Sequence, residues 1–93
     1  MRNAPAARVA VGDTEFIVRH NSYRAEAVRT SAAAHPTVAA MLLRARAAME
    51  TASGCTVRPG TLYGDAVLSE AFLDCPGQQP ARLQPRWIYS PPG

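Results

Sequence analysis

The sequence predicts an α+β domain in which one helix packs across a small antiparallel sheet, in the order β-β-α-β-β. Three observations indicate this class. Apolar residues alternate over 7–30, recur at helical spacing over 36–53, and alternate again between two cysteines over 55–75. The 93 residues make one small domain. We expect a flexible N-terminus over 1–6, the α+β domain over 7–75, and a Pro-rich, mostly disordered tail over 76–93.

Residues 7–30 are predicted to form a meander of two long strands, or of three if the returning segment also forms one. Gly12-Asp13 has the composition of a two-residue hairpin turn, which places Val9 opposite Phe16.

A second turn is expected over 20–23, because Asn and Ser side chains hydrogen-bond to their own backbone in turns. The returning segment over 24–30 then places Ala25 opposite Val18.

The segment 36–53 has the pattern of an amphipathic helix. Pro36 suits the first helical turn, where its missing N–H would have no partner, and Gly54 suits a left-handed C-terminal cap. Glu50 lies near the C-terminal end and opposes the helix dipole, at a cost of a few tenths of a kcal/mol. The apolar face consists of Val38, Met41, Leu42, Ala45, Met49 and Ala52.

The segment 55–75 is predicted to be a hairpin with Asp65 at its tip. This arrangement places Cys55 directly opposite Cys75, within the distance that a disulfide can bridge. Pro59-Gly60 interrupts the first strand, so an edge position, a bulge or a kink is expected there.

The expected core joins the helix to one face of the sheet. It comprises Val38, Met41, Leu42, Ala45 and Met49 against Val9, Phe16, Val18, Val57, Val67 and Leu73. Ile17, Leu68 and Phe72 point to the other face, where they are expected to pack on the tail or on a second copy of the protein.

Cys55 and Cys75 are the only cysteines, and we interpret them as a structural disulfide. Two unpaired core thiols, or metal or redox chemistry, are the alternatives. A crosslink predicts a periplasmic or exported protein, because structural disulfides persist in oxidising compartments. Without the crosslink the expected location is cytoplasmic, since the N-terminus has no secretory h-region.

The sequence contains no recognisable catalytic, cofactor-binding or metal-binding set, so a non-enzymatic protein without a cofactor is expected. His20 and His35 fall in a predicted turn and just before the helix, and no nucleophile motif accompanies them. The carboxylates Asp65, Glu70 and Asp74 are better explained by turn geometry and a partly wet sheet face.

The net charge of +3 comes from ten arginines and no lysine, which is typical of GC-rich codon usage. The arginines are scattered among acidic residues, which disfavours nucleic acid as a partner. A nucleic-acid-binding module remains the alternative function, and it would use Arg8, Arg19, Arg24 and Arg29 with Tyr23. No apolar run is long enough for a transmembrane segment.

The tail carries one apolar island, Arg86-Trp87-Ile88-Tyr89. This island is expected either to dock on the domain itself or stay idle, or to contact a partner protein by adding a strand or entering a groove.

Residues 36–75 resemble a family of small uncharacterised bacterial proteins. The resemblance rests on a helix that runs into Gly54-Cys55, a Gly64-Asp65 step, and a strand that closes in Cys75. It implies an exported or lipoprotein-like, disulfide-bonded domain of unknown function, with no functional residue to carry over. The sequence therefore predicts a structural or protein-interaction module of the bacterial cell envelope, with an unknown protein partner or self-association.

Overall fold

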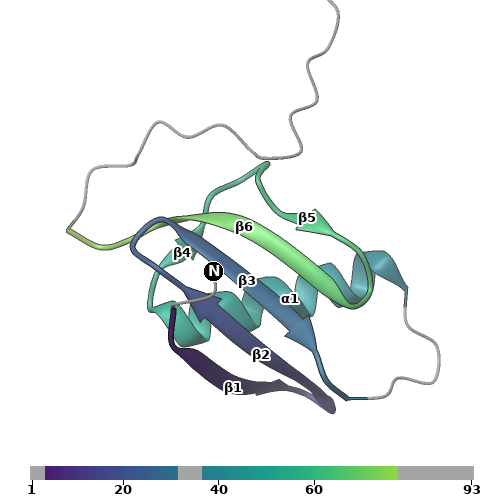
Figure 1. The fold of residues 1–93 in the computed structure, drawn as a ribbon. Coiled ribbons are helices and arrows are strands. Elements are labelled where there is room, and N and C mark those ends of the chain that lie inside the picture. The colour runs from purple at the N-terminus through teal and green to yellow at the C-terminus, as the bar shows by residue number, and fades with distance from the viewer. Residues whose placement is uncertain (1–3, 32–36, 78–93) are drawn as a thin grey trace, which may run out of the picture.

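A computed structural model describes residues 4–31 and 37–77 and confirms the α+β class, with one helix across one face of an antiparallel sheet (Figure 1). The strand order is β1-β2-β3-β6-β4, and β5 also pairs with β6. The returning segment is a full strand, so three strands precede the helix, and short β5 adds a strand after it. The elements are β1 (Ala6–Val11), β2 (Thr14–His20), β3 (Arg24–Arg29), α1 (Val38–Ser53), β4 (Thr56–Val57), β5 (Tyr63–Gly64) and β6 (Leu68–Asp74).

The first hairpin has the predicted turn and register. Val9 pairs with Phe16, and Val11 pairs with Thr14 across the two-residue turn. Gly12 has φ 62°, which a residue without a Cβ adopts at little cost. The hairpin turn with Gly first matches the twist of the flanking strands.

The second turn is at the predicted place, but the predicted register of the following strand is wrong by two residues. Val18 pairs with Ala27 instead of Ala25. The cause is the side chain of Asn21, whose Oδ1 accepts hydrogen bonds from the N–H groups of Tyr23 and Arg24 at 2.9 and 2.8 Å. This turn closes between residues 21 and 24, later in the chain than a turn centred on 20–23.

The helix α1 begins two residues later than predicted because Thr37 caps it. The Oγ1 of Thr37 accepts a hydrogen bond from the N–H of Ala40. Pro36 and His35 lie outside the described residues. At the other end, Gly54 adopts the predicted left-handed cap with φ 71° and donates its N–H to the Glu50 carbonyl.

The C-terminal hairpin has the predicted register only at its open end. Val57 pairs with Leu73 there, whereas nearer the tip Tyr63 pairs with Glu70. The chain advances six residues from Val57 to Tyr63, whereas β6 spans only three from Leu73 back to Glu70, so the tip lies past Asp65. The predicted interruption at Pro59-Gly60 is thus confirmed.

The core lies between α1 and the sheet, as predicted, but three of the expected core residues are not buried, and one of them, Leu42, is half-buried on α1. Val67 is 48% exposed because it sits in the bend before β6, and Val38 is 47% exposed in the first helical turn. Ser69, two residues after Val67, is the first residue of β6 that points into the core, and it is buried. The buried cluster comprises Val9, Phe16, Val18, Ala25, Ala27, Ala45, Ala48, Met49, Val57, Ala71 and Leu73.

Candidate functional site

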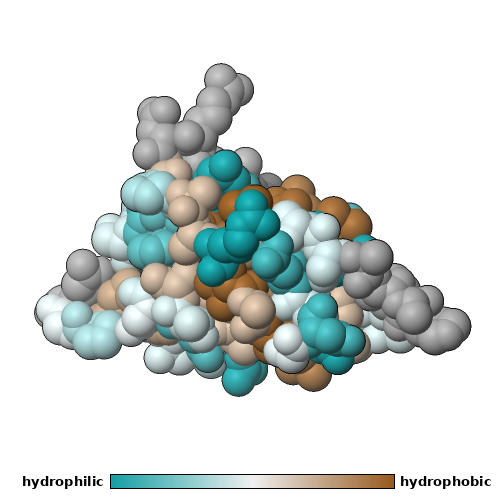
Figure 2. Space-filling model, turned by 90° about the horizontal axis from the view of Figure 1, so that it is seen from below, coloured by the Kyte–Doolittle hydropathy of each residue, from teal (hydrophilic) through white to brown (hydrophobic). Residues whose placement is uncertain are grey.

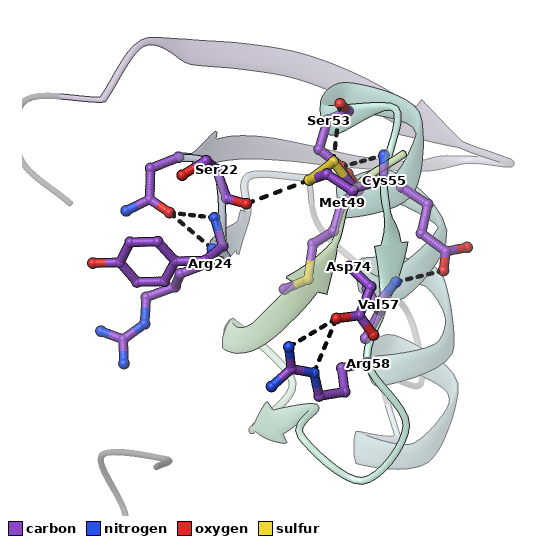
Figure 3. Close-up of a disulfide and its surroundings, with 12 residues drawn as sticks. Ser22, Arg24, Met49, Ser53, Cys55, Val57, Arg58 and Asp74 are labelled. Atoms are coloured by element: carbon purple, nitrogen blue, oxygen red, sulfur yellow. Dashed lines mark hydrogen bonds and ion pairs between the residues drawn. A yellow bond between two sulfur atoms is a disulfide. The ribbon is translucent and has the colours of Figure 1, made fainter. Parts of the chain in front are cut away.

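The disulfide predicted from the sequence is present and joins two distant segments of the chain. Cys55 follows Gly54, the cap of α1, and Cys75 follows β6, with their Cα atoms 4.3 Å apart (Figure 3). Both residues pack against the core. The crosslink therefore fixes the end of the helix to the end of the last strand of the sheet.

Hydrogen bonds position the first half of the crosslink. The hydroxyl of Ser53 donates to the carbonyl of Met49 at 2.7 Å and accepts from the N–H of Cys55 at 3.0 Å. On the other side, the Sγ of Cys75 lies 3.5 Å from the carbonyl oxygen of Ser22 (Figure 3). A disulfide sulfur carries no hydrogen, so this last approach is a packing contact.

Glu50 has a structural role that the sequence did not reveal. Its Oε2 accepts the N–H of Val57 at 2.9 Å, and it thereby ties the last helical turn to β4. Val57 is buried, so this N–H would otherwise lack a partner. The bond offsets the predicted repulsion between the carboxylate and the helix dipole.

The loop after β4 is held against β6 by a network centred on Arg58. Its Nε and Nη2 donate to the same Oδ1 of Asp74, at 3.0 and 2.8 Å. The hydroxyl of buried Thr61 donates to the Arg58 carbonyl at 2.7 Å and accepts the N–H of Phe72 at 3.1 Å. The ion pair of Arg58 and Asp74 thus stabilises the fold. The predicted hairpin register places these two residues diagonally across the strands, so the sequence could have suggested their contact.

Asp65 has the turn role that the sequence predicted. Its Oδ1 accepts hydrogen bonds from the N–H groups of Val67 and Leu68, both at 2.8 Å. These bonds, that from Leu68 foremost, lower the pKa of Asp65 because they stabilise the carboxylate. This carboxylate therefore serves to stabilise the turn in which it lies.

The face of the sheet opposite α1 carries mixed charge. Phe72 lies on this face yet is only 2% exposed, and the guanidinium of Arg24 stands 5.3 Å from its ring centroid. Arg8 and Arg19 share the face. The registers of β1, β2, β3 and β6 interleave three acidic residues with these arginines, namely Glu15, Glu26 and Glu70.

Arg29, the fourth arginine of the nucleic-acid hypothesis, lies on the other face. It pairs with Phe16, whose side chain is in the core, and its Nε and Nη1 are buried without a hydrogen-bond partner. Tyr23 is 41% exposed in the turn before β3. The structure therefore brings three of the four arginines onto one face and separates the fourth.

The outer edge of β1 is the part of the sheet where backbone groups remain available. Within the described residues β1 pairs on one side only, with β2. Glu15 directs its N–H to the Ser31 hydroxyl and its C=O to the Thr30 N–H, both on the β3 side. Ala10, which is opposite Glu15, therefore belongs to a pair without hydrogen bonds between β1 and β2.

The same alternation sets the direction of the other β1 groups. Ala6, Arg8 and Ala10 direct their N–H and C=O groups away from β2, toward the outer edge. All three residues are exposed. β1 is the lowest strand of Figure 1, and the view from below in Figure 2 shows hydrophobic residues at the middle of this side between hydrophilic ones.

The remaining candidates from the sequence do not assemble into a reactive site among the described residues. His20 ends β2 and is half-buried, and no three His, Cys, Asp or Glu side chains in the described ranges gather as a metal site would require. The island Arg86-Trp87-Ile88-Tyr89 lies outside the described residues. No helix in the described ranges is both long and apolar enough to cross a membrane.

Two shallow clefts occur on the described surface. One, of about 230 Å³, lies between the C-terminal half of α1 and the loop after β4, and another, of about 220 Å³, lies beside β5. Both are smaller than the roughly 300–1,000 Å³ typical of small-molecule sites. The first is lined by Arg46, Glu50, Thr56, Val57, Arg58, Pro59, Gly60 and Leu62, several of which are already engaged in the contacts above.

Comparison with protein-family models, with curated proteins and with solved structures found no match to this chain. The crosslinked domain and its β1 edge are therefore the features from which a function is inferred.

Proposed function

We propose that this protein is a non-enzymatic structural or protein-interaction module of the bacterial cell envelope. The observation that carries the proposal is the disulfide between Cys55 and Cys75, which fastens the helix end to β6. A small domain buries a limited fraction of its surface and gains much of its stability from such a crosslink. Crosslinks of this kind persist where the compartment is oxidising.

Polar side chains support the same proposal, because three carboxylates that could have served chemistry are engaged in holding the fold. Glu50 accepts from Val57, Asp65 accepts from its own turn, and Asp74 pairs with Arg58. The β1 edge, by contrast, presents backbone donors and acceptors, which is how many protein-interaction modules bind an added strand.

Thiol trapping in intact cells of the natural host tests the compartment and the crosslink together. Cells are treated with a maleimide that adds mass before lysis, and the protein is then compared with and without prior reduction. We expect no labelling of Cys55 or Cys75 unless a reductant is added first. Labelling of both thiols in untreated cells would refute the envelope assignment.

A nucleic-acid-binding module is the second candidate, favoured by the shared face of Arg8, Arg19 and Arg24. The acidic residues interleaved on that face weaken it, because a phosphate backbone requires a surplus of positive charge. Titration with labelled single-stranded DNA and RNA at low and moderate salt decides the matter. Binding that weakens steeply with salt would support this candidate, and no binding at low salt would reject it.

A further inference from the structure

We propose that the β1 edge binds the β1 edge of a second copy of this chain, so that two sheets join into one across a two-fold axis. The proposal deepens the function proposed above, since it names the partner of the interaction module. It begins from the outward N–H and C=O groups of Ala6, Arg8 and Ala10.

The edge lacks the features that usually prevent strand addition. Natural edge strands are protected by bulges, prolines, lysines or very short length. β1 has six residues, Ala-Ala-Arg-Val-Ala-Val, and pairs with β2 in an unbroken register without a bulge. Arg8 is its one charged residue. An antiparallel copy of the same strand supplies matching donors and acceptors, because a two-fold interface is self-complementary.

The charges on the outer face select one register. Outward backbone groups pair with outward groups, so Arg8 meets Ala6, Arg8 or Ala10 of the partner. Pairing with the partner's Arg8 sets like charges side by side. Pairing with the partner's Ala6 places Arg8 in the same row as the partner's Arg19, which is opposite Ala6 on β2. Both arrangements are repulsive.

Pairing of Arg8 with the partner's Ala10 gives the opposite result. Ala10 stands opposite Glu15, so each Arg8 shares a row with the partner's Glu15 across a small alanine side chain. The Arg8 side chain is 66% exposed and already contacts Glu15 of its own chain, 2.8 Å from Nη1 to Oε1. The two arginines and two glutamates then alternate in sign around the two-fold axis.

The same register is favourable on the face that α1 covers. The two-fold axis passes beside Val9, which meets the partner's Val9 in a close pair without hydrogen bonds. Phe16 stands behind each valine. Val9 and Phe16 both belong to the buried core, so the apolar row continues from one sheet into the other. The charges and the apolar row therefore both favour a second copy of the chain at the β1 edge, paired in the register that sets Arg8 opposite Ala10.

Sedimentation velocity of the full chain over a wide concentration range is the first measurement. We expect a monomer–dimer equilibrium. In the Arg8→Glu variant the dissociation constant should rise at least about tenfold, because the introduced carboxylate would share a row with the partner's Glu15. Glu15→Arg should have the same effect by placing two guanidinium groups in that row. Far-UV circular dichroism and urea unfolding confirm that each variant is folded.

Mixing the two single variants tests the register itself. Each alone is expected to be monomeric, and the mixture should form a heterodimer, because every cross-chain row then pairs opposite charges. The contact within each chain stays like-charged in the mixture, so recovery reports the interface alone. A mixture that stays monomeric while the wild type dimerises would overturn this register.

Ala10→Pro tests the backbone pairing without reversing charge. The Ala10 N–H makes no bond to β2, so proline there should leave the fold intact and abolish the dimer, whereas Ala10→Ser should not. A wild-type chain that is monomeric up to about 1 mM would overturn the proposal and leave the edge to a segment of another protein. That outcome would not alter the thiol-trapping result, so the two proposals fail separately.

Discussion

The disulfide offers the most quantitative prediction about stability. It closes a segment with a sequence separation of 20 residues between Cys55 and Cys75. The chain-entropy estimate for a loop of this length is about 3 kcal/mol of lost unfolded-state freedom. For a domain of this size the whole free energy of unfolding is about 5–10 kcal/mol, so the crosslink contributes a large share. Reduction should lower the melting temperature by about 15 °C.

The assay is urea and thermal unfolding of the same preparation with and without a phosphine reductant. The control is the double variant Cys55→Ala/Cys75→Ala, whose unfolding should not respond to reductant. Reduced wild type should also be the more stable of the two uncrosslinked forms, since both sulfurs pack against the core. A reduced and an oxidised wild type that unfold within about 0.5 kcal/mol of each other would refute the entropic reasoning.

Substitutions at four further residues test the local contacts, each measured by urea unfolding. Glu50→Ala should cost about 1–2 kcal/mol because the buried N–H of Val57 loses its acceptor, whereas Glu50→Gln should be nearly neutral; equal losses would contradict this. Gly64→Ala should cost more than about 2 kcal/mol, because φ is 149° and a Cβ would collide with the backbone oxygen of Leu68. Gly12→Ala, with open space at φ 62°, should cost about 1 kcal/mol. A larger loss of stability at Gly12 than at Gly64 would be inconsistent with this geometry. The pKa of Asp65 is lowered on folding, so its stabilisation is full above pH 3.8 and is lost as the pH falls through the lowered value. The difference in the free energy of unfolding between wild type and Asp65→Asn should therefore shrink as the pH falls below 3.8. A difference that stays constant with pH would contradict this role of Asp65.

The sequence predicted those features that depend on a single local signal. The Gly12-Asp13 turn set the first hairpin, because a two-residue turn permits one register. Gly54 marked the helix end, and the two cysteines marked the open end of the C-terminal hairpin. Each of these signals acts through backbone conformation or covalent reach, and none depends on distant packing.

The errors arose where a side chain or a turn redirected the backbone. Asn21 accepts two N–H groups and shifts β3 by two residues, although the turn itself was recognised. The turn at residues 59–60 similarly changes the pairing near the tip of the C-terminal hairpin. Alternation counted back from Cys75 placed Val67 inside, but Val67 lies in the bend before β6 and is 48% exposed. Thr37 was a stronger helix start than the proline before it.

The polar contacts of Glu50 and Arg24 could not be predicted, because they join elements whose relative placement is set by packing. Glu50 reaches Val57 only because the crosslink and the Gly54 cap turn β4 back along the helix. Arg24 meets Phe72 only because β3 and β6 are neighbours, which requires the helix to carry the chain over the sheet.

The position of the crosslink also determines how the domain bears tension. Cys75 directly follows β6, so a load applied to the backbone at Cys75 acts on β6 and, through the disulfide, on Cys55. Such a load is shared at once by β6 and by the junction of α1 and β4, so β6 cannot be peeled from its C-terminal end alone. A segment joined there is anchored to two elements through one covalent point.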